Sequence, residues 1–197
     1  MIKGEIDMGY KVPIGVSNKH IHLTQEAVEI LFGEGHHLTV KKVLIQPTQF
    51  AAEEKVDIVG PKTTLKGVRV LGDVRPKIQL EISMTDARTL GLKVPVMESG
   101  HHEGTPGCKI VGPCGEVDIE DGVIVALRHL HFDPKTAEEA GVKDKEWVKI
   151  RLGDQRATVF ENCLCRVSEN YLLECHIDTD EANAAGVASG DFCEIVK

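Results

Sequence analysis

Aromatic side chains are scarce in this sequence, and long apolar runs are missing. Only 4% of the 197 residues are aromatic, whereas apolar residues make up 42%, so a core would consist mainly of Val, Ile, Leu and Ala. No run approaches the roughly 18 uninterrupted apolar residues of a membrane-spanning helix. The N-terminal segment contains Glu5 and Asp7 and lacks the apolar stretch of a secretory signal. We therefore expect a cytoplasmic globular protein with no membrane partner.

The sequence also lacks a C-x-x-C motif and an excess of basic residues. Without that motif, a zinc ribbon or a thioredoxin-like site is not expected, and the six cysteines should remain thiols in a reducing compartment. The alternation around Cys163 and Cys165 predicts that both pack in a core. The net charge is −8, with dispersed acids, which disfavours nucleic-acid binding. An anionic ligand would have to be held by local arginines.

Two His-x-His motifs are the most informative feature that is present. His20 and His22 flank Ile21, and His129 and His131 flank Leu130. On a β-strand, residues two apart project from the same face, so each pair can direct two imidazoles at one point. Neutral imidazole is a common ligand of zinc and related metals. The two pairs therefore predict two metal sites.

The patterning predicts a mainly β fold with a few short helices. Short alternating segments separated by Gly and Pro turns are typical of barrels or sandwiches. Thr24 should cap a helix that ends at Gly33, and Asp133 should cap one that begins at Pro134 and ends at Gly141. Two further short helices are expected at 85–90 and 179–185. The expected strands are 12–16, 55–59, 67–71, 78–82, 109–111, 123–127, 147–152, 157–165, 171–176 and 192–196.

The predicted elements recur in the same order, which indicates an internal duplication. The two His-x-His motifs lie 109 residues apart, whereas the later pieces, such as Ile82 and Ile177, match at an offset of 95. The difference between these two offsets is explained by an insert at 36–54 of the first half. The offset of 95 superposes Glu81 on His176. Each half then offers two histidines and a third ligand, and such sets leave an open position for chemistry.

Other interpretations of these histidines fit parts of the sequence. The spacing of His20, His22, Glu26 and Gly33 fits a cupin motif, but a cupin needs Glu26 on a strand, and the segment after Thr24 is predicted to be helical. A non-enzymatic module held by two structural zinc ions is the other alternative. The doublets His36-His37 and His101-His102 lie in glycine-rich segments, and we expect them to be solvated.

The chain resembles the PduL-type phosphate acyltransferases, also called phosphotransacylases or phosphate propanoyltransferases. The resemblance rests on stretches such as VPIGVSNKHIHLTQE, VRVLGDVRPKIQLEIS, GVIVALRHLHF and HIDTDEANAAG, and covers nearly the whole chain. It implies two β-barrels capped by short helices, with two zinc ions in the site between them. The implied reaction converts an acyl-CoA and phosphate into an acyl phosphate and CoA. Acetyl and propanoyl groups, which differ by one methylene, both stay open.

The resemblance also assigns roles to individual residues. It implies that one metal is bound by His20, His22 and Glu81, and the other by His129, His131 and His176, which agrees with the repeat. Arg75 lies six residues before Glu81, on the same face if the strand is unbroken, and its guanidinium would suit phosphate. The hydroxyl of Ser99 is a further candidate for substrate contact.

The same resemblance sets the expected domain limits. Residues 19–99 would form the first barrel, including the 36–54 insert, and residues 9–18 plus 123–197 the second, whose sheet the N-terminal strand would complete. Residues 100–122 would connect the two. Only about ten residues precede Tyr10, and MIKGEIDMG shows no apolar stripe, so we expect no extension for encapsulation in a microcompartment. A homo-oligomer is compatible with these expectations.

Overall fold

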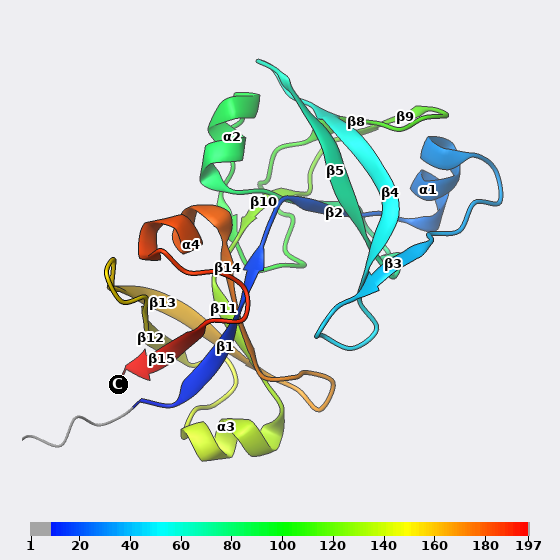
Figure 1. The fold of residues 1–197 in the computed structure, drawn as a ribbon. Coiled ribbons are helices and arrows are strands. Elements are labelled where there is room, and N and C mark those ends of the chain that lie inside the picture. Colours follow the sequence, from blue (N-terminus) through cyan, green and yellow to red (C-terminus); the bar gives the residue numbers. More distant parts are fainter. Residues whose placement is uncertain (1–8, 197) are drawn as a thin grey trace, which may run out of the picture. The chain divides into compact units, whose positions relative to one another are not determined.

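The computed structural model describes residues 9–196, which divide into two compact units. The first unit contains the described residues up to Val16 together with the chain from Arg128 onward, and the second unit contains Ser17–Leu127. Figure 1 labels most of the elements of the two units. Residues 1–8, which include most of the segment where no encapsulation helix was expected, lie outside the described residues.

The first unit is a closed β-barrel of six strands. Its apolar interior contains Leu130, Phe132 and Ile150, together with Cys163 and Cys165, which confirms the predicted burial of these two thiols. The strand order is β1 (Lys11–Ser17), β14 (Glu174–Asp178), β11 (His129–Phe132), β13 (Thr158–Val167), β12 (Trp147–Leu152) and β15 (Phe192–Val196).

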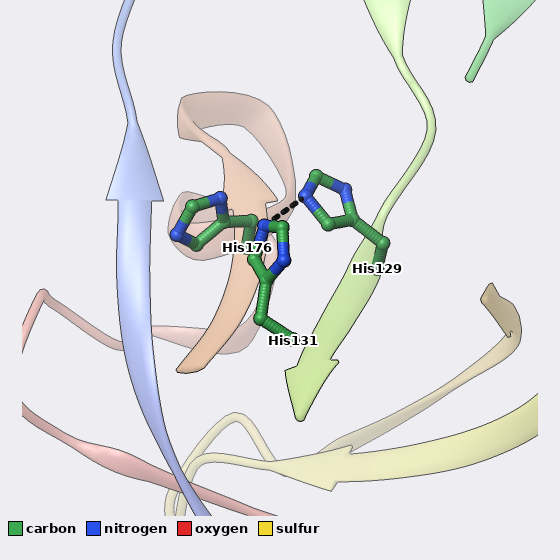
Figure 2. Close-up of side chains that lie close together, drawn as sticks. All are labelled: His129, His131 and His176. Carbon is green, nitrogen blue, oxygen red and sulfur yellow. Dashed lines mark hydrogen bonds between the residues drawn. The ribbon is translucent and has the colours of Figure 1, made fainter. Parts of the chain in front are cut away.

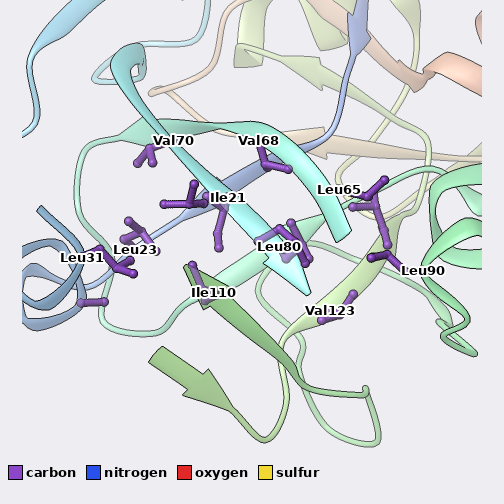
Figure 3. Packing of buried hydrophobic residues seen from close by; sticks show 14 of the residues in the cluster. Ile21, Leu23, Leu31, Leu65, Val68, Val70, Leu80, Leu90, Ile110 and Val123 are labelled. Carbon is purple, nitrogen blue, oxygen red and sulfur yellow. The ribbon is translucent and has the colours of Figure 1, made fainter. Parts of the chain in front are cut away.

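The second unit is a curled sheet of nine strands that does not close into a barrel. Its core, drawn in Figure 3, is formed by Leu, Ile and Val side chains such as Ile21, Leu80 and Ile110. The strand order is β7 (Val96–Met97), β10 (Val123–Ala126), β6 (Gln79–Glu81), β2 (His20–His22), β5 (Thr64–Gly72), β4 (Phe50–Val59), β8 (Cys108–Val111) and β9 (Glu116–Ile119), with β3 (Val40–Val43) paired to β4.

The mainly β class is therefore confirmed, but some segments differ from the expected arrangement. The segment 100–122, expected as a connector, supplies β8 and β9, and β8 pairs antiparallel with β4. The strand β10, which was placed with the second barrel, instead pairs in parallel with β6 and β7 of the other unit. Strand patterning reveals which face of a strand is buried but not which strand it pairs with.

The strands around the two His-x-His motifs pair in the same register. In the second unit, β2 and β6 are antiparallel, with His20 opposite Glu81. In the first unit, β11 and β14 are antiparallel, with His129 opposite His176. On their other sides, β2 and β11 each pair in parallel with one strand, β5 and β13 respectively. The duplication predicted from the sequence is thus present in the strand register.

In the part of the chain that the structure describes, four short helices follow strands of the two sheets, and the two predicted N-caps are present. Thr24 accepts a hydrogen bond from the backbone of Ala27 at the first helix, and Asp133 caps the third. Gly33, Gly91, Gly141 and Gly186 follow their C-terminal ends. The helices are α1 (Gln25–Phe32), α2 (Met84–Leu90), α3 (Pro134–Ala140) and α4 (Thr179–Ala185). Among the described residues, none of the helices has the length and apolar character needed to cross a bilayer.

Candidate metal centres

The first predicted set of ligands is brought together in the second unit. His20 and His22 alternate with buried Ile21 on β2 and therefore share one face of the strand, and β6 places Glu81 opposite His20. The potential ligand atoms of the three residues all lie within 4.8 Å of one another. Nε2 of His20 is 3.4 Å from Oε2 of Glu81. We call these three residues the β2 triad.

The orientation of His20 leaves one ring nitrogen available for a ligand. Its Nδ1 lies 2.8 Å from the carbonyl oxygen of Asn18, which can only accept a hydrogen bond. In the neutral imidazole the proton would therefore sit on Nδ1, which leaves the lone pair of Nε2 facing Glu81. A metal-binding histidine usually has its second nitrogen fixed in this way.

The second predicted set is brought together in the first unit (Figure 2). His129 and His131 project from one face of β11, and β14 places His176 opposite His129. The potential ligand atoms lie within 4.8 Å of one another, and Nε2 of His129 is 3.0 Å from Nε2 of His131. The ring centroid of His176 lies 5.0 Å from that of His129 and 4.8 Å from that of His131. We call these residues the β11 triad.

The spacing within both triads suits a small divalent cation such as zinc. Zinc binds nitrogen and oxygen ligands at about 2.0–2.2 Å, so two ligands of one tetrahedral ion lie roughly 3.3 Å apart. The distances of 3.4 Å between His20 and Glu81 and 3.0 Å between His129 and His131 are close to this value. Each group contains three candidate ligands among the described residues, so a tetrahedral ion would keep one position for another ligand.

The second histidine of each motif is buried and kept neutral. Burial lowers the pKa of His22 to about 3, helped by the charges of His20 and Arg75. Burial also lowers the pKa of His131 to about 2, helped by the neighbouring triad histidines. In both residues Nδ1 is buried and has no hydrogen-bond partner among the described residues. Hydrogen bonding therefore does not account for the buried Nδ1 atom of either ring, and the neutral imidazole is the form that binds metals.

A hydrogen-bonded network surrounds Glu81. The Ser99 hydroxyl donates to Oε1 of Glu81 at 2.9 Å, and Nε2 of Gln79 donates to the same oxygen at 2.6 Å. Ser99 is thus in contact with a predicted ligand, while its contact with substrate stays a prediction. His102 lies 3.0 Å from Oε1 of Gln79 and is only 9% exposed. The expectation that this histidine is solvated was wrong, because it packs beneath the network around Glu81.

Arg75 does not lie on the strand that carries Glu81. The strand β6 begins at Gln79, so Arg75 belongs to the segment that follows β5, and the argument from even spacing does not hold. Pro76, directly after Arg75, has no N–H to donate to a strand ladder. Arg75 is nevertheless half-buried, its backbone donates to the carbonyl of Leu23, and its charge contributes to lowering the pKa of His22.

Sequence reasoning missed Glu174, which contacts the β11 triad. Its Oε2 lies 2.7 Å from Nε2 of His176, and its exposed fraction is 6%. It also missed Gln79. The signal was available, because the offset of 95 superposes Gln79 on Glu174, and each lies two residues before the third member of its triad.

Comparison with known proteins finds relatives that match most of the chain. A family model described as phosphate propanoyltransferase matches residues 13–188. The chain is 54% identical to a phosphate propanoyltransferase of Thermotoga maritima over 93% of this chain and 88% of that protein. It is 51% identical to one from Salmonella typhimurium, over 89% of this chain and 83% of that protein. For one from Clostridioides difficile, the identity is 46% over 94% and 89% of the two chains.

Proposed function

The chain belongs to the phosphate propanoyltransferase family, and from this premise we propose that it works as a zinc-dependent enzyme with one metal in each triad. It is an acyl-CoA:phosphate acyltransferase. The proposed reaction interconverts a short-chain acyl-CoA and phosphate with an acyl phosphate and CoA. Acetyl-CoA and propanoyl-CoA are the two substrates to compare, and phosphate is the other small-molecule partner.

The observation that carries the metal dependence is the equivalence of the two triads. Both are held by an antiparallel strand pair in the same register, and each offers three buried or half-buried ligands within 4.8 Å. A chance cluster of histidines would have no reason to recur at the same register. When bound, a divalent metal with three protein ligands keeps an open position that can hold and polarise an oxygen ligand.

The alternatives fit the structure less well. A cupin would need Glu26 beside the histidines, but Glu26 lies in the first turn of α1. A structural zinc site is usually closed by four protein ligands and rich in cysteine, whereas each triad has three members and no cysteine.

The proposed chemistry is direct attack of phosphate on the thioester. A phosphate oxygen forms the new bond to the carbonyl carbon, the carbon–sulfur bond breaks, and CoA leaves as a thiolate. Because a thiolate is a tolerable leaving group, a strong general acid is not required. The guanidinium of Arg75 would neutralise phosphate charge, since its donors can bind two oxygens at once.

A covalent acyl-enzyme is disfavoured by the state of the cysteines next to the site. Cys175, which adjoins His176, is fully buried, and hydrogen bonds with Cys163 and Cys193 together with burial raise its pKa well above the usual range. Burial also raises the pKa of Cys165 to about 12. The thiolate, not the thiol, is the nucleophile, so these side chains are poor candidates for attack on a thioester.

The test combines kinetics with metal analysis on the purified chain. We expect acyl-CoA turnover that depends on phosphate, with intersecting initial-rate patterns and no acyl group retained on the protein. In His131→Ala the metal content should fall by about one ion per chain, because a three-ligand chelate is lost, and turnover should fall at least about 100-fold. Parallel double-reciprocal lines with an isolable acyl-protein would exclude direct attack. Unchanged metal content in both His22→Ala and His131→Ala would exclude the ligand assignment.

A further inference from the structure

The residue opposite the second histidine of each motif occupies an equivalent place in both units. In the second unit, His22 pairs with Gln79 across the strands β2 and β6. In the first unit, His131 pairs with Glu174 across β11 and β14. Both Gln79 and Glu174 are two residues before the third triad member and share its strand face. The duplication thus places a polar side chain beside the third ligand of each triad.

Both side chains contact that third triad member directly. Nε2 of Gln79 donates a hydrogen bond to Oε1 of Glu81 at 2.6 Å. Oε2 of Glu174 lies 2.7 Å from Nε2 of His176, and a carboxylate accepts from an imidazole N–H. Gln79 is 1% exposed and Glu174 is 6% exposed. These are buried contacts, so they persist in a setting of low dielectric constant and weak competition from water.

Gln79 and Glu174 differ in chemistry, and each supplies the hydrogen-bonding group that suits its partner. Glu81 is an acceptor, and it has the amide donor of Gln79 beside it. His176 can donate from one ring nitrogen while the other binds a metal, and it has the carboxylate acceptor of Glu174 beside it. When the contacting residue is included, Gln79 for the β2 triad and Glu174 for the β11 triad, each group contains one carboxylate. The total charge offered to a cation is therefore the same in both units, although the ligand sets differ.

The surroundings hold both contacts in place. The backbone N–H of Gly100 donates to Oε1 of Gln79 at 2.7 Å, which fixes the amide so that its Nε2 faces Glu81. In the first unit, Gly15 leaves room for the pair formed by Glu174 and His176. A Cβ at Gly15 would lie 2.5 Å from Oε1 of Glu174 and 3.2 Å from Cδ2 of His176.

We propose that Gln79 and Glu174 are positioning residues that orient the third metal ligand of the β2 triad and of the β11 triad, respectively. The proposal rests on the metal sites of the proposed function. Glu174 fixes the tautomer of His176 and raises the basicity of its free nitrogen, while Gln79 holds the carboxylate of Glu81 toward His20. Outer partners of this kind typically change metal affinity by about 10- to 100-fold when they are removed.

The test measures zinc affinity in chains that keep only one intact triad. His22→Ala leaves the β11 triad intact, and His131→Ala leaves the β2 triad intact. Each metal-free chain is titrated with zinc in competition with a chromophoric chelator. In the His22→Ala chain, Glu174→Gln should weaken zinc binding about 10- to 100-fold. In the His131→Ala chain, the same substitution should leave it unchanged.

The reciprocal substitution and two further variants complete the design. Gln79→Leu should weaken zinc binding only in the His131→Ala chain. Gly15→Ala, which removes no polar group, should weaken it only in the His22→Ala chain by displacing Glu174. Glu161→Gln, at an exposed glutamate of the first unit whose side chain pairs with Lys149, is the matched control and should change neither affinity.

The outcomes separate this inference from the proposed function. One outcome is that zinc binds to the His22→Ala and His131→Ala chains while substitutions at positions 79 and 174 leave the zinc affinity of both chains unchanged. In that case the positioning roles are wrong and the metal sites stand. If neither chain binds zinc, both proposals fall. Cobalt serves as a second probe, because its visible absorption reports the ligands bound directly. A changed cobalt spectrum in Glu174→Gln would make Glu174 a ligand and overturn its positioning role.

Discussion

Arg75 is the proposed phosphate contact, and its role can be tested separately from that of the metal ligands. It is half-buried and contributes to lowering the pKa of His22. We expect Arg75→Ala to raise the KM for phosphate by about 10- to 100-fold, the range given by hydrogen bonds to a charged group, with metal content unchanged. Arg88→Ala, at an exposed arginine of α2, is the control and should have no effect. Loss of metal with an unaltered phosphate KM would instead assign Arg75 a structural role.

The grouping of the triad residues could be predicted from the sequence, whereas the supporting residues were missed, although the offset of 95 also relates Gln79 to Glu174. His20 and His22 share a strand face by parity alone, and the repeat offset then pointed to Glu81. Gln79 is two residues from Glu81, but a buried glutamine resembles many core-edge polar residues in a sequence. The burial of His102 depends on its contact with Gln79 across 23 residues, which local patterning does not contain.

At the scale of elements, the 36–54 insert carries a buried carboxylate whose ionisation should stabilise the fold. Glu54 on β4 lies 2.9 Å from Nε2 of His36 and accepts from the backbone N–H of Thr39. Burial alone would raise its pKa, but these hydrogen bonds outweigh burial and lower the pKa below its usual value of 4.5. The stabilisation is therefore present above about pH 4.5 and is lost as the pH falls through the lowered value.

Glu54→Gln should reduce the free energy of unfolding by about 1 kcal/mol at pH 7, measured by denaturant titration. The difference between the two proteins should stay constant from pH 7 to about 4.5 and shrink below that, because the wild-type carboxylate takes up its proton only as the pH falls through its lowered pKa. Glu53→Gln is the matched control, since the neighbouring Glu53 is exposed and pairs with Lys41 at the surface. A difference that stayed constant with pH would show that the Glu54 charge does not contribute.

Helices and strands were predicted with different success for a physical reason. A helix is defined by nearby residues, so the caps at Thr24 and Asp133 were sufficient to place α1 and α3. A strand needs a partner that can lie far away in the chain. The strand β1 precedes β2 in sequence but belongs to the barrel of β11, which the family resemblance implied and the alternation did not, and β10 precedes β11 but pairs with β6. This exchange between units leaves no mark on the alternation of either strand.

For the whole molecule, we expect metal removal to lower stability without unfolding the chain. Each unit has its own apolar core, so the metal-free protein should remain folded. Bound metal stabilises only the folded state, by about 2.7 kcal/mol per site when free metal is 100 times the dissociation constant. For a chain of this length, each kcal/mol corresponds to about 2–4 °C in Tm. Chelation by EDTA should therefore lower the Tm by about 5–11 °C for each occupied site, and zinc should restore it.

Variants that keep only one intact triad should show how the stabilisation by metal is divided between the two units. His22→Ala and His131→Ala should each lose part of the response to EDTA, because one triad remains intact in each. The double variant His22→Ala/His131→Ala should have a lowered Tm that EDTA no longer changes. Metal release would be measured in parallel by elemental analysis. If EDTA removed the metal from the wild-type chain and the Tm did not move, neither triad would contribute to folding, because a ligand bound only by the folded state must raise its stability.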